Sequence, residues 1–346
     1  MRVLSHLART TAALALIFGT AAQAQEAGMR VDTVLDSHVL PRFTALAEAT
    51  ETLKTTAADS CTPDGPAGPA LEQAFHAAFD AWIGASHLRF GPTEAEDRAH
   101  AMAFWPDTKG FTKKALNRLI GAESDIVVAP ERFADSSIAG RGLFALEYLL
   151  FDENMRTNGP AQYRCALATA IATDLDRNAD AILADWRDSY ADQMRTPGED
   201  TPFRSDEEAL QVLYQSLLTG LQFSADTRLG RPLGTFDRPR PRRAEAWRSQ
   251  RSLANLTASL AALEELSALL AKGHDEVAGK LTDDFTRLGD MTDALEDPTF
   301  AGVADPMTRF RIEAIQTAIN AIRETVTWQL GNALGVQEGF NALDGD

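Results

Sequence analysis

The sequence has very little cysteine: Cys61 and Cys165 are its only two thiols in 346 residues. Neither lies in a CxxC pair, which argues against a thiolate metal site of the zinc-ribbon type. In an oxidising compartment, an even pair of cysteines favours a disulfide over a metal site. A Cys61–Cys165 bond would close a loop of about 100 residues and add up to ~4–5 kcal/mol of stability on the chain-entropy model.

Several catalytic signatures are also missing. The chain has no GxSxG nucleophile elbow, no GxGxxG or Walker A phosphate loop, and no HExxH zinc-protease helix. Neither cysteine lies beside a plausible catalytic histidine, and the paired ExxH segments of a di-iron helical bundle are absent. The sequence therefore offers no ready-made hydrolase, nucleotide or di-iron site.

Positive charge is in short supply. The chain has 33 Lys and Arg against 50 Asp and Glu, a net charge of −17 at pH 7. Such a charge disfavours nucleic acid and anionic lipid as general partners. With 45% apolar residues, the chain is long enough for one large domain or two smaller ones with a real core.

Long apolar runs are confined to the N-terminus. The segment MRVLSHLARTTAALALIFGTAAQAQE has a basic start, an apolar run over 12–18 and an AQA tripeptide ending at Ala24. That run is shorter than the roughly 20 apolar residues that cross a bilayer, and we expect no later segment to approach that length. We predict a signal peptide over 1–24, cleaved near Ala24, and a periplasmic mature protein with no transmembrane segment. The lack of a lipobox cysteine argues against a lipid anchor.

Apolar residues recur at spacings of three and four, and no segment alternates for long. This pattern predicts an all-α fold of two packed helical-bundle halves. The clearest helices are LEQAFHAAFDAWIGASHLRF, SDEEALQVLYQSLLTGLQF, SLANLTASLAALEELSALL and IEAIQTAINAIRETVTWQL, the second opening with a Ser205–Glu208 capping box. Proline and glycine concentrate over 195–203. We predict a domain boundary there, with an N-terminal half over 25–197 and a C-terminal half over 203–346.

Arginine concentrates between positions 228 and 251, which hold eight arginines and two acids. Guanidinium groups bind carboxylates and phosphates well. The excess predicts one of three roles: pairing with the protein's own surplus acids, holding a carboxylate or phosphate ligand, or docking an acidic protein partner. The first is the simplest in so acidic a chain. The last would make the protein a structural adaptor that docks a periplasmic partner through Arg240, Arg242 and Arg243.

One acid stands inside an almost unbroken apolar stretch, AGRGLFALEYLLFDE at 139–153. On a helix, Glu147 shares an arc with three leucines, and apolar residues cover the other faces. Glu147 is therefore expected to be buried, and a buried carboxylate must be neutralised, hydrogen-bonded or paired. Arg89, Arg141 or a tyrosine would satisfy it structurally. Alternatively, Glu147 is a ligand or acid–base residue in a closed pocket.

A second polar constellation comes from His76 and Asp80, which are spaced to share one face of a helix. Together they offer two metal ligands. A third would come from a partner helix that carries His38, His100 or His274. His87 lies roughly 16 Å beyond His76 along the same helix, so these two cannot share an ion. A polar helix face in solvent explains the same residues more simply.

Several blocks together resemble the imelysin family, an exported bacterial group also described as insulin-cleaving membrane proteases or imelysin peptidases. The stretch around Glu147 is similar to the family's GxHxxE helix, with Gly142 as its glycine. Other blocks that match, in the same order, are AWIGASHLRFGP, FWPDTKG, LTGLQFSADTRLGRPLG, EAWRSQRSLANL and LGVQEGFNALDGD. The resemblance spans most of residues 30–346. It implies a role in bacterial iron uptake, since members of the family are often encoded beside haem-containing oxidoreductases.

One position departs from the family pattern, because Phe144 stands where the motif has histidine. A His and a Glu three residues apart present two ligands to a metal from one helix face, and Phe has no lone pair to donate. The resemblance thus implies iron or zinc as a cofactor, but Phe144 removes the support for either. Hydrolysis by metal-activated water loses its first ligand in the same way.

We therefore predict a non-catalytic or degenerate member: a binding or accessory component of iron or haem uptake, with a periplasmic haem- or iron-related protein as its partner. Glu147 would hold a cationic group or anchor an interior polar network near the junction of the halves. Side chains from the family-like blocks are expected beside it. The candidate binding site is Glu147, Phe144, Gly142, Arg89, Asp107 and Arg248. The alternatives are a metallopeptidase whose ligands come from elsewhere, and the adaptor described above.

Overall fold

The structure is a computed structural model in which residues 25–336 are described. The predicted signal peptide and most of the closing sequence block lie outside the described residues. Within them, the chain is helical apart from loops, an isolated β-bridge and one antiparallel hairpin of β1 (Cys61–Thr62) and β2 (Gly65–Pro66). The predicted all-α fold is confirmed.

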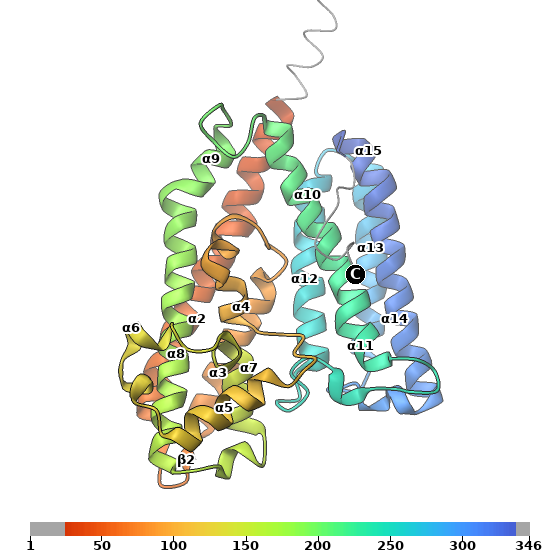
Figure 1. Ribbon diagram of the computed structural model, residues 1–346. Helices are drawn as coiled ribbons and strands as arrows, with labels where there is room; N and C mark the ends of the chain where they lie inside the picture. The colour runs from red at the N-terminus through yellow and green to blue at the C-terminus, as the bar shows by residue number, and fades with distance from the viewer. Residues whose placement is uncertain (1–24, 337–346) are drawn as a thin grey trace, which may run out of the picture.

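The N-terminal half is built on three long helices: α2 (Leu40–Asp59), α3 (Pro69–Ala85) and α8 (Ala161–Asp185). α2 continues the first helix through a π-helical turn at Leu35–Val39 and packs along both α3 and α8. Shorter helices lie on this frame: α4 (Arg98–Met102), α5 (Phe111–Ala122), α6 (Pro130–Phe133), α7 (Gly142–Phe151) and α9 (Ala191–Arg195). The residues between α3 and α8 thus fold back onto the long helices (Figure 1).

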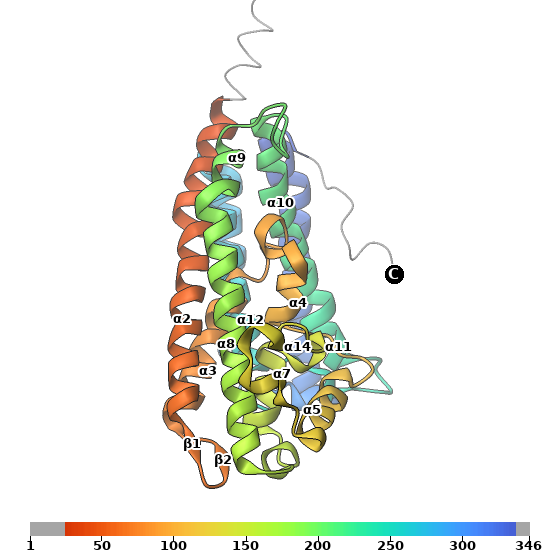
Figure 2. The ribbon, with the colours of Figure 1, turned by 60° about the vertical axis from the view of Figure 1, so that its left-hand side comes forward.

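The C-terminal half is a bundle of four long helices: α10 (Asp206–Gln222), α12 (Ser252–Ala271), α13 (Asp275–Asp293) and α14 (Pro306–Thr325). α12 and α14 each pack on both α10 and α13. The short helices α11 (Gly230–Leu233) and α15 (Gly331–Leu334) follow π-helical turns at the ends of α10 and α14. The long helices of both halves run along one common axis (Figures 1 and 2).

Local sequence explains where two of these helices begin. Ser205 caps α10 by accepting a hydrogen bond from the Glu208 amide at 3.4 Å. The Glu208 carboxylate accepts from the amide of Arg204, one residue before the donor of a standard capping box. α14 begins with an aspartate cap, Asp305, followed by proline at its first position. Both devices satisfy amides that have no partner inside the helix.

α3 and α12 pack against each other where the two halves meet. Buried apolar side chains of both halves belong to one continuous core. The predicted boundary over 195–203 falls on the segment between α9 and α10. The division into domains at that point stays a prediction, because the core itself does not divide there.

The predicted disulfide between Cys61 and Cys165 is present, with an S–S distance of 2.07 Å. It joins the β1–β2 hairpin to the start of α8, 104 residues later along the chain. Arg164, next to Cys165, donates hydrogen bonds to the carbonyl oxygens of Asp64 and Gly159. Covalent and polar contacts together hold the end of the N-terminal half where the β1–β2 hairpin lies beside α8 (Figure 2).

By length and composition, α12 is the single helix of residues 25–336 that is long and apolar enough to cross a membrane. The expectation that no segment after the signal approaches that length was therefore wrong. Half of its apolar window is buried inside the protein, and α3, α10 and α13 pack against it. Its place between the two halves accounts for its apolar composition.

Candidate functional site

α7 begins at a glycine because no side chain fits there. Gly142 has φ +76°, a conformation that residues with a Cβ rarely adopt. A Cβ at this position would lie 2.4 Å from the carbonyl oxygen of Ala101 and 2.6 Å from that of Met102. The motif glycine therefore lets α7 start in direct contact with the end of α4, and its role is packing.

Glu147 on α7 has 1% of its surface exposed, so it is buried as the apolar pattern predicts. Its Oε1 accepts two hydrogen bonds from Ser249, one from the amide at 3.0 Å and one from Oγ at 2.9 Å. Neither arginine expected as a structural partner pairs with Glu147, since Arg89 pairs with Glu94 and Arg141 with Asp174.

The charge state of Glu147 is shaped by its surroundings. Burial raises the pKa of Glu147 above 4.5, the usual value for glutamate, because it disfavours the charged carboxylate. The Ser249 amide and hydroxyl and the charge of Arg248 lower this pKa without cancelling the effect of burial. Glu147 is thus held by hydrogen bonds from the loop that carries Ser249, and its burial makes ionisation costly.

Arg248 lies near Glu147 but bonds to other groups. Its Nε donates to Oδ2 of Asp152 at 3.1 Å, and its Nη2 donates to the Tyr148 hydroxyl at 2.7 Å. Its guanidinium carbon is 3.8 Å from the centroid of the Tyr148 ring and 4.5 Å from that of Trp247. Stacking and hydrogen bonds therefore hold this cation in one orientation beside α7.

Phe144 fills the histidine position of the motif with an aromatic cluster. It is buried, its ring stacks on Trp105 at a centroid distance of 6.1 Å, and it meets Phe79 edge to face at 5.3 Å. Such ring pairs stabilise a core beyond the area they bury. The side chain that would donate a metal ligand in the family pattern is here part of an apolar wall.

A cavity of about 100 Å³ adjoins Glu147. α7 contributes Phe144, Glu147 and Tyr148 to its lining, and the segment before α5 contributes Trp105 and Asp107. The rest of its charged lining comes from the C-terminal half, in the form of Arg231, Arg242, Arg243 and Arg248. The cavity therefore lies where the two halves meet, and arginine dominates its charge.

Asp107 shares this cavity with Glu147, where the sequence blocks place it. Its Oδ1 accepts from the amide of Phe111 at 2.9 Å and its Oδ2 from the amide of Thr112 at 2.8 Å, at the start of α5. Burial raises the pKa of Asp107, but these amide hydrogen bonds outweigh it and hold the pKa below its usual value. Asp107 is thus an ionised helix cap whose two oxygens are both used.

A second cavity, of about 420 Å³, is lined by residues of both halves. Phe144 and Trp105 line it as well, so their rings form a wall between the two cavities. Arg89 lines this second cavity, and the expectation that Arg89 lies beside Glu147 was wrong. The reason is geometric: the residues that follow α3 line the second cavity, which the rings of Phe144 and Trp105 separate from the cavity beside Glu147.

His76 and Asp80 do not form the predicted metal pair. Arg251 contacts both: its Nη1 is 3.1 Å from Nδ1 of His76, and its Nη2 donates to Oδ1 of Asp80. A guanidinium group therefore takes the place of a cation between them. Partial burial first, and then the charge of Arg251, lower the pKa of His76.

The residues near Glu147 do not fit the iron or zinc that the motif implies. Phe144 has no donor atom, Oε1 of Glu147 is occupied by Ser249, and the surrounding arginines repel a cation. Among residues 25–336, no group of three or more His, Cys, Asp or Glu side chains is placed to hold a metal ion. The charge of the lining favours a negatively charged ligand.

A pair of histidines in the N-terminal half, next to α12 of the other half, was missed in the sequence. Nε2 of His38 and Nε2 of His87 are 2.9 Å apart, and both rings are buried. Arg42 donates to Nδ1 of His38 at 3.2 Å, and the same nitrogen is 3.5 Å from Glu265 on α12. Burial is the main cause that lowers the pKa of each histidine. No local spacing signals this contact, because 49 residues separate the two rings.

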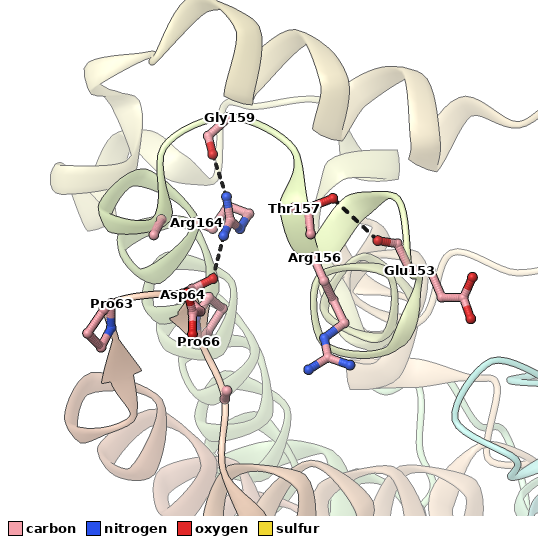
Figure 3. Close-up of a pocket in the computed structure, with 10 residues that line it drawn as sticks. Pro63, Asp64, Pro66, Glu153, Arg156, Thr157, Gly159 and Arg164 are labelled. Atoms are coloured by element: carbon pink, nitrogen blue, oxygen red, sulfur yellow. Dashed lines mark hydrogen bonds between the residues drawn. The ribbon is translucent and has the colours of Figure 1, made fainter.

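A hollow of about 500 Å³ lies beside the disulfide, between the β1–β2 hairpin and the loop before α8 (Figure 3). Figure 3 shows Arg164 donating to the carbonyl oxygens of Gly159 and Asp64, while Arg156 extends into the hollow. Arg164 is thus used to hold the two loops together. The hollow is a groove between loops and shares no lining residue with the cavity beside Glu147.

The family model of imelysin, peptidase M75, matches residues 39–326 of the chain. The chain belongs to the imelysin family. The protein named iron-regulated protein A of Synechococcus elongatus is 23% identical over 342 residues, which cover 92% of this imelysin-family chain and 90% of that protein. The resemblance inferred from separate sequence blocks is therefore confirmed.

Two solved structures share the fold of this imelysin-family protein. An imelysin-like protein from Psychrobacter arcticum superposes with a TM-score of 0.77 at 20% identity, covering 92% of this chain and 98% of the other. A putative iron-regulated protein A precursor from Parabacteroides distasonis gives a TM-score of 0.71 at 14% identity, with 88% and 96% covered. The arrangement of helices is thus common to relatives whose sequences differ widely.

Proposed function

We propose that this imelysin-family protein is an exported, non-catalytic binding protein of an iron-linked process, with its ligand site in the cavity beside Glu147. The observation that carries the proposal is that the motif helix, α7, lacks the metal ligand of the family pattern. Phe144 packs on Trp105 and Phe79 where a metal ligand would stand, and Ser249 engages the remaining carboxylate. A metallopeptidase needs a metal-bound water, and this lining offers it one carboxylate among arginines.

The link to iron and to export rests on relatives and on the N-terminal sequence. Two similar proteins carry the name iron-regulated protein A, and one of them is named as a precursor. A precursor agrees with the signal peptide that we predict over 1–24. A periplasmic location, and a partner that handles iron or haem, belong to the same proposal.

Metal analysis and a peptidase assay test the non-catalytic role. Protein purified without chelator is expected to hold far less than stoichiometric zinc or iron and to leave peptide substrates uncut. The matched variant Glu147→Gln, which keeps the shape of the side chain, is expected to have the same metal content. Stoichiometric metal that is lost in Glu147→Gln, or hydrolysis that a chelator abolishes, would contradict the proposal.

Phe144→His tests why the motif lacks a metal. A histidine three residues before Glu147 restores two donors on one helix face, so zinc affinity in a calorimetric titration is expected to rise. Phe144→Leu is the matched control, because it also removes the ring but adds no donor. Equal zinc affinity in the two variants would show that Phe144 does not replace a ligand.

An adaptor role is a second candidate, favoured by the exposed part of the arginine-rich loop. Arg238 and Arg240 are exposed and make no ion pair with any described residue, and Phe236 beside them is 74% exposed. Docking through these charges predicts association that weakens with salt. Pull-down after charge reversal at Arg240, Arg242 and Arg243 tests it, and unaltered binding would eliminate the loop as the contact.

A further inference from the structure

The eight arginines of positions 228–251 divide into two groups. Three of them pair with acids: Arg228 with Glu245, Arg248 with Asp152 and Arg251 with Asp80. The other five make no ion pair with any residue in 25–336: Arg231, Arg238, Arg240, Arg242 and Arg243. Pairing with the protein's own acids therefore explains only part of this charge excess. Three of the unpaired arginines line the cavity beside Glu147, namely Arg231, Arg242 and Arg243.

Aromatic rings hold two of these arginines in place. The guanidinium carbon of Arg231 lies 5.7 Å from the centroid of the Trp105 ring, and that of Arg242 lies 5.7 Å from the centroid of Trp247. Nε of Arg231 is buried and has no hydrogen-bond partner among the described residues. Burial first, and then the charge of Arg243, lower the pKa of Arg231. Donors and positive charges are thus gathered here, and none of these three arginines has an ion-pair partner among the described residues.

The acids of the lining do not neutralise this charge. Both oxygens of Asp107 are used by amides of α5. Glu147 accepts from Ser249, and burial raises its pKa, which favours the neutral form. Arg248, the fourth arginine of the lining, already has Asp152 as its partner. The cavity therefore keeps an excess of positive charge in a protein whose net charge is −17.

We propose that this cavity binds a compact oxyanion with two or more negative charges, of the kind that phosphate and small polycarboxylates such as citrate represent. Guanidinium groups present paired N–H donors that match phosphate and carboxylate oxygens. A volume of about 100 Å³ suits a small anion. Ferric iron binds to oxygen donors, so an anionic iron chelate would reach this site without metal ligands from the protein. The inference rests on the proposed binding function and names its class of ligand.

Calorimetric titration with three probes tests the proposal: inorganic phosphate, citrate and ferric citrate. Binding of at least one probe is expected, and the pattern among the three tells a free anion from an iron chelate. Arg231→Gln and Arg243→Gln are each expected to weaken it about tenfold, which corresponds to the loss of one charged hydrogen-bonding group. Arg238→Gln is the matched control for Arg243→Gln, because both arginines are exposed and only Arg243 lines the cavity. No binding of any probe, or equal binding in all variants, would overturn the proposal.

Glu147→Gln separates an anion site from a cation site. An ionised Glu147 would repel the anion and a neutral one would not, so Glu147→Gln is expected to bind oxyanions at least as strongly as the natural protein, whereas a metal site would lose its ligand. Weaker oxyanion binding in Glu147→Gln would overturn the charge argument. Arg231→Lys keeps the charge but not the paired donors and is expected to bind with intermediate affinity. Circular dichroism identifies any variant that fails to fold.

Failure of this inference is distinguishable from failure of the proposed function. If no oxyanion binds while the protein holds no metal and cuts no peptide, the ligand class is wrong and the non-catalytic role stands. If a metal and peptidase activity are found, the non-catalytic role is wrong whatever the titrations show.

Discussion

At the scale of single residues, Ser249 has one hydroxyl proton and two acceptors for it. Its Oγ lies 2.9 Å from Oε1 of Glu147 and 3.1 Å from the carbonyl oxygen of Ala246. The hydroxyl donates to one of them at a time. An ionised Glu147 attracts that proton more strongly than a neutral one, so the hydrogen bonding of the loop responds to the charge of the buried acid.

The raised pKa of Glu147 makes a prediction for stability. The folded protein binds the proton of this carboxyl more tightly than the unfolded chain, so its stabilising contribution is complete below pH 4.5 and is lost as pH rises through the folded pKa. Each unit of such a shift corresponds to ~1.4 kcal/mol. Urea unfolding of Glu147→Gln and of the natural protein should therefore show a difference that moves in favour of the variant as pH rises. A difference that is independent of pH would contradict the burial argument.

The sequence predicts the burial of Glu147 but not its partner. Burial follows from the apolar residues on every side of one helix, which is a local pattern. Ser249 is 102 residues away and belongs to the other half, so no local pattern connects the two. The expected partners were arginines or a tyrosine, because their charge or size stands out in a sequence, whereas a serine amide and hydroxyl carry no such signal.

At the scale of elements, α7 depends on its contact with the end of α4. Gly142→Ala places a Cβ in a left-handed backbone conformation and within 2.6 Å of two carbonyl oxygens. The backbone conformation alone costs roughly 1–2 kcal/mol, and the overlap adds to it, so we expect a loss of at least ~2 kcal/mol in chemical unfolding. A change below about 0.5 kcal/mol would show that α7 can shift away from α4 without cost.

Gly279→Ala is the matched control for that substitution. Gly279 is exposed on α13, and a Cβ there would meet nothing within 4 Å. Alanine is the better helix former, so this variant should gain about 0.5–1 kcal/mol. Opposite signs at the two glycines would locate the effect at the seat of α7 and exclude a general response to losing glycine.

The arginine-rich segment over 228–251 shows what can and cannot be predicted from composition alone. The local excess of charge is evident from the sequence, and so is the choice between self-pairing and ligand binding. Which arginines find acids depends on how the loop folds across α3 and α7, because Asp80 and Asp152 lie far away in the chain. Three of the eight arginines pair with acids and five do not, an outcome that no single interpretation of the composition contains.

At the scale of the whole molecule, the disulfide closes a long segment of the N-terminal half. The bonded cysteines are 104 residues apart, and on the chain-entropy model such a loop contributes up to ~4–5 kcal/mol. Replacing both cysteines by serine should lower the melting temperature measured by circular dichroism. Added reductant should lower the melting temperature of the natural protein but leave that of the double variant unchanged. Equal melting temperatures would show that packing alone holds the hairpin on α8.

The His38–His87 pair predicts acid sensitivity of the junction between the halves. The pKa of each histidine is lowered from 6.5, so the unfolded chain binds these protons more tightly than the folded protein does. Stability is then lost as pH falls below about 6.5, by up to ~1.4 kcal/mol per pH unit for each such proton. Arg42 and Arg228 strengthen this effect, whereas Glu265 opposes it at His38.

Urea unfolding at pH values on both sides of 6.5 measures this sensitivity. His87→Gln removes the group whose pKa is lowered most clearly, so its stability should vary less with pH over the same range than that of the natural protein. An identical pH dependence in the two proteins would mean that other groups cause the acid sensitivity.

The all-α fold and its long helices are predictable because apolar residues recur every three to four positions along each helix. How the two halves pack together is harder to predict from the sequence. One core runs through both, and α12 carries enough apolar surface to face α3 on one side and α10 and α13 on others. From the sequence alone, an apolar helix at an internal junction and one that crosses a membrane are hard to tell apart.

The wall of Phe144 and Trp105 has a consequence for what the protein can admit. Both rings line the cavity of about 100 Å³ beside Glu147 and also the second cavity of about 420 Å³. A smaller side chain at position 144 would remove part of this wall and is expected to connect the two cavities. If the cavity binds a ligand as proposed, the residue at the histidine position of the family motif would limit the size of that ligand instead of supplying a metal ligand.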